Sequence, residues 1–157
     1  MITKLKLLTL IPLICYLSSY LFEKPVLVKE SADSRLVREA ILDYVEGVYT
    51  ANPSRIRRSV HPDLVKRGTV RNRDSGEYSD LKEMNFEQLV ELATTWNKSG
   101  KRADSGSVKE IELYDVQDKT AAAKLTAVWG TDYFHLAKIE GRWMIMNVLW
   151  QTPQPEY

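Results

Sequence analysis

The chain has 157 residues, of which 44% are hydrophobic and 27% charged, and its 22 basic and 21 acidic side chains leave a formal net charge of +1. This balance provides no strong positive field, so we expect no binding to nucleic acid. One cysteine, Cys15, and two histidines exclude an internal disulfide and a structural zinc site. We expect neither a metal nor a cofactor.

Residues 1–22 have the features of an export signal or an uncleaved membrane anchor. Lys4 and Lys6 form a basic start, and the run from Leu7 to Phe22 is uncharged and interrupted only by Pro12. The run is longer than the apolar part of most signal peptides and shorter than the ~20 residues that span a bilayer. We therefore expect an exported protein, periplasmic or extracellular, or one anchored to the membrane through this segment alone. The alternative is a buried core helix, which the lack of an amphipathic pattern disfavours.

One domain is expected over residues 34–152, between a polar linker at 23–33 and a C-terminal tail at 153–157. Apolar residues recur in pairs four apart between Leu36 and Tyr49, which predicts an amphipathic first helix. The dipeptide Asn52-Pro53 predicts the start of a short second helix, and His61-Pro62 predicts its end.

A third helix and several strands complete the domain. Asn85 followed by Gln88 is a capping-box pattern, and the helix that it predicts ends at Ser99-Gly100. Residues 64–71 predict a strand, with a second extended piece near Tyr78. From Val108 onward the pattern predicts a four-stranded antiparallel run.

Two short turns give a predicted register for residues 120–150. Glu140-Gly141 and Gly130-Thr131 both suit two-residue hairpin turns, and both place the same residues on one face. The face predicted to point inward carries Ala123, Leu125, Ala127, Trp129, Asp132, Phe134, Leu136, Trp143, Ile145, Asn147 and Leu149. The face predicted to point outward carries Lys124, Thr126, Val128, Tyr133, His135, Ala137, Met144, Met146, Val148 and Trp150. A turn longer by one residue exchanges the two faces.

The predicted outer face includes an apolar patch of Met144, Met146 and Trp150. A sheet that is apolar on both sides and covered by helices on one tends to bind a second protein. We therefore predict a homodimer through these three residues. Loops or the C-terminal tail covering the patch are the alternative.

Four parts of the sequence stand out: Tyr44-Val45-Glu46-Gly47, His61-Pro62-Asp63, Asp132-Tyr133-Phe134 and residues 138–145. With the order of elements, they resemble the pattern of the putative lumazine-binding subgroup of the nuclear transport factor 2-like superfamily. In that superfamily a strongly bent sheet forms a cystatin-like cone around a long first helix. The resemblance covers most of residues 34–152. It implies an α+β fold of three N-terminal helices packed on a strongly curved, mostly antiparallel sheet. It also implies an aromatic or heterocyclic small-molecule ligand.

The inward face and the first helix supply the candidate site residues. An apolar pocket with a few polar groups is a usual small-molecule site, and the ligand-binding candidates are Tyr44, Trp129, Phe134, Trp143 and Asn147. The aromatic members could equally belong to a closed core. The basic residues Lys66 and Arg67, with the arginines at 55, 57 and 58, are interpreted as solvated surface.

Asp132 and His61 are the catalytic candidates. A carboxylate among aromatic side chains suits proton transfer, but beside a turn its commoner role is to bond backbone amides. His61 could act as an acid or base at the mouth of the cone, or could bond the last carbonyls of the second helix. His135 is predicted to face outward and is not a candidate.

Two functions follow from these residues. The first is an exported or anchored, non-catalytic domain that binds a small molecule in the cone. The second is an isomerase-like or dehydratase-like enzyme in which Asp132 or His61 moves a proton. A closed core with a purely interaction role is a third alternative. Alanine at both positions abolishes turnover and spares binding only in the second case.

Overall fold

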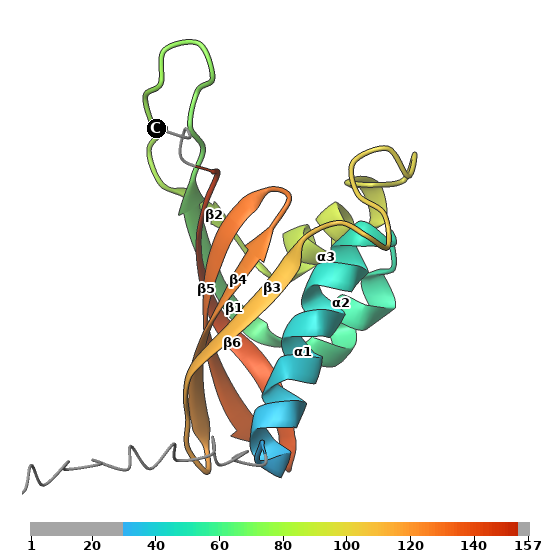
Figure 1. The fold of residues 1–157 in the computed structure, drawn as a ribbon, viewed down its shortest axis with the longest axis vertical. Coiled ribbons are helices and arrows are strands. Elements are labelled where there is room, and N and C mark those ends of the chain that lie inside the picture. Colours follow the sequence, from blue (N-terminus) through green and yellow to red (C-terminus); the bar gives the residue numbers. More distant parts are fainter. Residues whose placement is uncertain (1–29, 154–157) are drawn as a thin grey trace, which may run out of the picture.

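The structure is a computed structural model that describes residues 30–153 (Figure 1). The predicted leader at 1–22, residues 23–29 of the predicted linker and residues 154–157 of the predicted tail lie outside the described residues. Within residues 30–153 no helix has the length and apolar character needed to cross a membrane.

Three helices form where the caps predict them. α1 (Ala32–Tyr49) begins after Ser31, whose Oγ accepts a hydrogen bond from the Ser34 N–H at 2.9 Å. α2 (Pro53–Ser59) has Asn52 as its cap, and α3 (Phe86–Thr95) carries the complete capping box of Asn85 and Gln88. The predicted starts of α2 and α3 are confirmed, while α1 begins at Ala32, four residues before Leu36, where the predicted apolar stripe begins.

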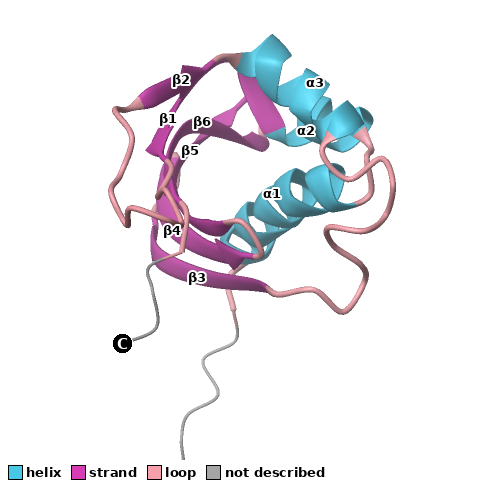
Figure 2. Cartoon of the chain, turned by 90° about the horizontal axis from the view of Figure 1, so that it is seen from above, coloured by secondary structure: helices cyan, strands magenta, loops and turns pink. Residues whose placement is uncertain are grey.

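Six strands form one sheet in the order β2-β1-β6-β5-β4-β3. All neighbours are antiparallel except β1 and β6, which run parallel. Figure 2 shows the sheet as an arc with the three helices on its concave side. This arrangement confirms the predicted α+β class with a curved, mostly antiparallel sheet. The strands are β1 (Val60–Thr69), β2 (Lys82–Met84), β3 (Lys109–Val116), β4 (Thr120–Ala127), β5 (Gly130–Ile139) and β6 (Arg142–Gln151).

One of the two predicted turns is confirmed and the other is displaced. Glu140 and Gly141 have φ values of 49° and 80°, as a tight hairpin turn between β5 and β6 requires. The β4–β5 turn is Val128-Trp129, because Ala127 pairs with Gly130. The predicted turn at Gly130-Thr131 is therefore wrong by two residues. An even shift keeps each side chain on its predicted face, so the inward face of β4 and β5 is unchanged.

A bulge in β6 overturns the predicted register of its second half. Leu136 pairs with Ile145 as predicted, but the next residue, His135, pairs with Asn147, so Met146 is the extra residue. Past Met146 every side chain lies on the opposite face from the one predicted. The residues that move inward are Val148 and Trp150, and those that move outward are Asn147 and Leu149.

The predicted dimer surface is not formed by its three residues together. Trp150 lies on the concave face, and Met144 is only 5% exposed. The exposed apolar side chains of the outer face include Tyr133 and Leu149, which pair across β5 and β6, and Val65 on β1. The placement of Trp150 outside was wrong because the bulge reverses it, and the homodimer itself stays a prediction.

Candidate functional site

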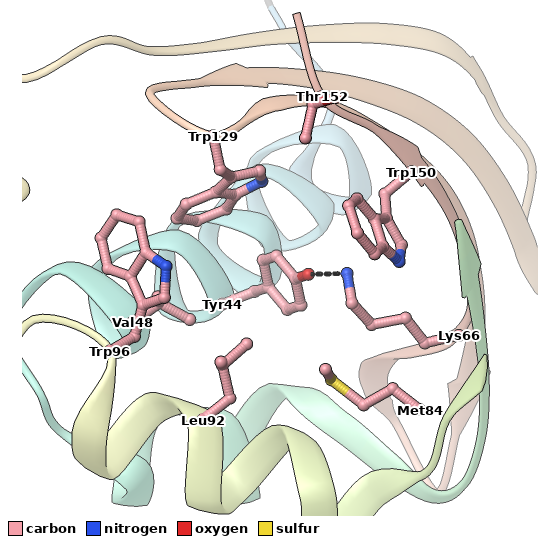
Figure 3. Close-up of a pocket in the computed structure, with 9 residues that line it drawn as sticks. All are labelled: Tyr44, Val48, Lys66, Met84, Leu92, Trp96, Trp129, Trp150 and Thr152. Atoms are coloured by element: carbon pink, nitrogen blue, oxygen red, sulfur yellow. Dashed lines mark hydrogen bonds between the residues drawn. The ribbon is translucent and has the colours of Figure 1, made fainter. Parts of the chain in front are cut away.

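A cavity of about 240 Å³ lies inside the cone, between the sheet and the helices (Figure 3). Its walls come from α1, β1, β2, α3, β6 and the β4–β5 turn, so distant parts of the chain meet here. The side chains that line it are Tyr44, Val48, Lys66, Met84, Leu92, Trp96, Trp129, Trp150 and Thr152.

Lys66 is the charged group in this wall. Alternate residues of β1 are buried, and Lys66 takes its place between Leu64 and Gly68 on the inward side. The side chain is 5% exposed, and its Nζ donates a hydrogen bond to the Tyr44 Oη at 2.7 Å. Figure 3 shows the ammonium beside the phenol at the edge of the cavity. Strand alternation has thus placed a cation where an apolar residue is usual.

Asp132 supplies the opposite charge from β5. Its Oδ1 lies 3.4 Å from the Lys66 Nζ, and its Oδ2 accepts a hydrogen bond from the Trp129 Nε1 at 2.7 Å. Asp132 is fully buried and does not line the cavity. A buried charge requires such partners, so the carboxylate holds Lys66 and Trp129 in place from behind the wall.

Burial shifts the proton affinities of the two groups that meet in the wall. Desolvation lowers the pKa of Lys66 below its ordinary value, and the charge of Asp132 opposes this change. Desolvation raises the pKa of Tyr44 well above its ordinary value, and the Asp132 charge adds to the rise. The Lys66 Nζ also lies 5.4 Å and 5.3 Å from the ring centroids of Tyr44 and Trp150, within the range of cation–π attraction. Tyr44 therefore presents a neutral phenol, and Lys66 presents donors to the cavity.

Interlocked aromatic rings make the rest of the wall rigid. The Trp129 ring meets Tyr44, Tyr49 and Trp96 edge to face, with centroids 6.3, 5.3 and 5.5 Å away. The Tyr49 Oη donates to the Val108 carbonyl at 2.6 Å and accepts from the Val128 N–H at 2.9 Å. These bonds fix the β4–β5 turn, so Trp129 is held in its position before any ligand arrives.

Among the ligand-binding candidates predicted from the sequence, Tyr44 and Trp129 lie in the cavity wall. Phe134 packs edge to face behind Tyr44, at 5.1 Å, and does not reach the cavity. Trp143 donates its Nε1–H to the Asp33 Oδ1 at 2.9 Å, at the first turn of α1. Asn147 lies on the outer face, where its Nδ2 is 3.3 Å from the His135 Nδ1. The structure therefore brings two of the five together at this cavity.

His61 lies at the start of β1, away from the cavity. Its Nδ1 accepts a hydrogen bond from the Asp63 N–H at 3.2 Å, and it is not among the residues that line the cavity. Within the described residues, no cluster of three or more His, Cys, Asp or Glu side chains has the spacing to hold a metal ion.

Lys66, Trp96 and Trp150 belong to the wall and were missed from the sequence. The interpretation of Lys66 as solvated surface is wrong, because the alternation of β1 turns it inward while Arg67 faces solvent. The pattern Leu64, Lys66, Gly68 is the signal that could have identified it. Trp150 was assigned to the outer face, and Trp96 was not among the candidates.

Comparisons with known proteins agree with this architecture. The sequence pattern of the family described as "Putative lumazine-binding" matches residues 32–151. No curated protein matches the chain. A solved NTF2-like protein from Shewanella baltica is 17% identical, with a TM-score of 0.57, and the match covers 77% of this chain and 94% of that one.

Two further solved structures are similar in fold. An NTF2-like protein from Silicibacter pomeroyi has a TM-score of 0.56 at 15% identity, covering 76% of this chain and 94% of that one. A ketosteroid isomerase-like protein from Erwinia carotovora atroseptica has a TM-score of 0.54 at 14% identity, covering 80% and 99%. At such identities the likeness concerns the fold alone. The family match covers most of the chain, which has an NTF2-like fold, and the chain therefore belongs to the putative lumazine-binding family.

Proposed function

We propose that the domain binds a small, flat heterocyclic molecule of the lumazine type inside the cone, without chemical turnover. The observation that carries the proposal is the buried ammonium of Lys66, which within residues 30–153 is the one charged group in a wall whose other residues, apart from Thr152, are apolar or aromatic. Such a site combines apolar surface for a ring with a placed polar group for orientation. The family name supports a ligand of this class.

The size and the walls of the cavity favour one small ring system. Its volume of about 240 Å³ is below the ~300–1,000 Å³ of most sites for drug-sized ligands. Trp96, Trp129 and Trp150 offer ring faces and edges against which a planar ligand can stack. A flexible or branched ligand would leave these faces incompletely covered.

Lys66 provides the polar recognition. Its ammonium has three N–H donors, and within the described residues the two partners recorded for it are Tyr44 and Asp132. The third donor is available to an acceptor on the ligand, such as a ring carbonyl of lumazine. A ligand that lacks an acceptor should bind more weakly, because the buried N–H donor of Lys66 would then have no hydrogen-bond partner on the ligand.

The enzyme alternative has less support. It depends on Asp132 or His61 as the acid or base, yet Asp132 is fully buried behind Lys66 and Trp129, and His61 lies outside the cavity. A general base must come within hydrogen-bond reach of the proton that it removes. The ketosteroid isomerase-like structure shares the fold at 14% identity and lends no residue to this argument.

Calorimetric titration of the domain with lumazine tests the proposal. We expect saturable binding to the wild type, loss of binding in Leu92→Trp because the larger side chain fills the cavity, and at least about tenfold weaker binding in Lys66→Met. Leu81→Trp is the matched control, because Leu81 is 62% exposed and lines no part of the cavity. Absence of lumazine binding, or equal binding by the Leu92→Trp variant, contradicts the proposal.

We also propose that residues 1–22 export the domain or anchor it to a membrane. The basic Lys4 and Lys6 followed by an uncharged run support this proposal. Fractionation of cells expressing the full chain tests it. Recovery of the full-length chain as a soluble cytoplasmic protein contradicts it.

The predicted homodimer also belongs among the proposals. With Trp150 inside the cone, the outer face offers Val65, Tyr133 and Leu149 as exposed apolar contacts. Sedimentation of the wild type and of Leu149→Asp tests this surface. A monomeric wild type at high protein concentration contradicts the dimer.

A further inference from the structure

A second, larger cavity of about 590 Å³ adjoins the first at the open end of the cone. The two cavities share Trp96, Trp129 and Thr152, so a ligand in the inner cavity can extend past these residues into the outer one. The remaining wall of the outer cavity consists of Val70, Arg71, Arg73, Arg102, Val128 and Pro153.

Three arginines from two loops surround this outer cavity. Arg71 and Arg73 come from the loop between β1 and β2, and Arg102 comes from the loop between α3 and β3. Among residues 30–153, none of the three guanidinium groups has a carboxylate within 4.0 Å or a hydrogen-bond acceptor. Most other arginines of the domain are paired with an acidic side chain, as Arg58 is with Asp43 at 2.6 Å.

The cluster is fixed to the wall of the inner cavity. The Arg102 guanidinium lies 5.4 Å from the centroid of the Trp96 ring, and Trp96 lines both cavities. The backbone N–H of Arg71 donates to the Thr152 Oγ1 at 2.7 Å, and Thr152 also lines both cavities. The Arg102 guanidinium therefore lies against the wall that the two cavities share, and the backbone of Arg71 is bonded to the same wall.

Among residues 30–153, the lining of both cavities contains no acidic residue, and none of the three guanidinium groups has a carboxylate within 4.0 Å. A concave site lined by one sign of charge attracts the opposite sign, and the guanidinium fork matches the oxygens of a carboxylate or phosphate. We infer that the ligand is an aromatic heterocycle carrying an anionic carboxylate or phosphate group, which Arg71, Arg73 and Arg102 bind at the mouth of the cone.

This inference rests on the proposed function and names the class of its ligand. Titrations with lumazine, a carboxylated lumazine and a lumazine bearing a phosphate ester test it at low salt. We expect the wild type to bind an anionic derivative at least about tenfold more tightly than lumazine, since charge-assisted hydrogen bonds are the stronger kind. The derivative that binds more tightly, the carboxylate or the phosphate ester, indicates which anionic group the natural ligand carries.

The triple variant Arg71→Ala, Arg73→Ala, Arg102→Ala should lose this gain and keep its affinity for lumazine itself. Arg142→Ala is the matched control, because Arg142 is exposed, has no recorded ion pair and begins β6, beside the β5–β6 turn. Added salt should weaken the binding of the anionic derivative to the wild type, and should have less effect on its binding to the triple variant.

Failure of this inference and failure of the proposed function are distinguishable. Equal affinity of the wild type for lumazine and both derivatives overturns the anion site alone. A gain that survives in the triple variant does the same. Absence of binding by lumazine overturns the proposed function.

Discussion

Gly68 on β1 pairs with Trp150 on β6, and a Cβ atom at Gly68 would lie 2.3 Å from the Trp150 indole. The indole therefore lies directly against the strand backbone, in space that any side chain at position 68 would occupy. Trp150 faces this way because of the bulge at Met146. A missing side chain on one strand and an extra residue on the next together shape one wall of the cavity.

Gly68→Ala should therefore displace the Trp150 indole toward the cavity. We expect a loss of about 1–3 kcal/mol in the free energy of unfolding, from overpacking, together with weaker lumazine binding. Denaturant unfolding and calorimetry measure the two effects. Gly106→Ala is the control, because its Cβ would meet only the Asp104 Oδ1, at 3.6 Å. Equal behaviour of the two variants contradicts the account of this wall.

Removing one member of the buried Lys66–Asp132 pair should cost more than removing both charges. Lys66→Met leaves the Asp132 carboxylate buried with Trp129 as its remaining partner, and we expect a loss of about 3–5 kcal/mol. In Lys66→Met, Asp132→Asn the amide oxygen can still accept the Trp129 N–H without a charge, so most of the stability should return. A double-mutant cycle by urea unfolding measures the coupling. Additive effects of the two changes argue against a coupled pair.

Alkaline titration should show two opposite effects from this site. The pKa of Lys66 is lowered from 10.5, so the unfolded chain binds more protons between the lowered pKa and 10.5, and stability rises with pH in that window. The pKa of Tyr44 is raised above 10.0, so above pH 10.0 the folded chain binds more protons and stability falls. Unfolding at a series of pH values from about 8 to about 11 measures both.

A separate substitution tests each effect. Lys66→Met should remove the rise in stability with pH, and Tyr44→Phe should remove the fall in stability above pH 10.0. A pH profile that neither substitution changes would show that these two groups do not titrate differently on folding.

Asp33 should contribute to acid stability at the other end of α1. Hydrogen bonds from Lys138 and then from Trp143 lower the pKa of this carboxyl from 3.8. The stabilisation is present above 3.8 and is lost as the pH falls through the lowered value. Asp33→Asn should remove this part of the acid dependence, as followed by unfolding at acidic pH. Asp118→Asn is the control, since Asp118 is exposed and makes no recorded ion pair. If Asp33→Asn keeps the acid dependence of the wild type, or if Asp118→Asn reduces it equally, the assignment to Asp33 is wrong.

The sequence was most informative where local chemistry decides the structure. Asn52, Asn85 and Gln88 mark helix starts because their side chains bond specific backbone groups nearby. Glu140-Gly141 marks a hairpin because a tight turn of this kind needs positive φ at both positions. The parallel pairing of β1 with β6 joins residues far apart in sequence, and no local signal specifies it.

The site was less predictable because alternate residues of a strand face opposite sides of the sheet, so a shift of one residue moves a side chain out of the site. Tyr44 and Trp129 were identified correctly as neighbours, with ring centroids 6.3 Å apart, although Trp129 lies in the β4–β5 turn and not on the predicted strand. Asn147 and Trp150 were exchanged, because the bulge at Met146 shifts β6 by one residue and nothing in the two turns reveals it. Lys66 was missed since a buried lysine is rare, and only its alternation with Leu64 and Gly68 indicates where it faces.

The indole N–H signals of the four tryptophans, recorded by NMR during a lumazine titration, test the central claim most directly. Trp96, Trp129 and Trp150 line the cavity, while Trp143 is bonded to Asp33, about 16 Å along α1 from Tyr44. The account predicts that the first three signals shift on binding and that the Trp143 signal does not. Lumazine binding that leaves the three cavity signals in place, or that shifts Trp143 alone, would contradict a ligand site in the cone.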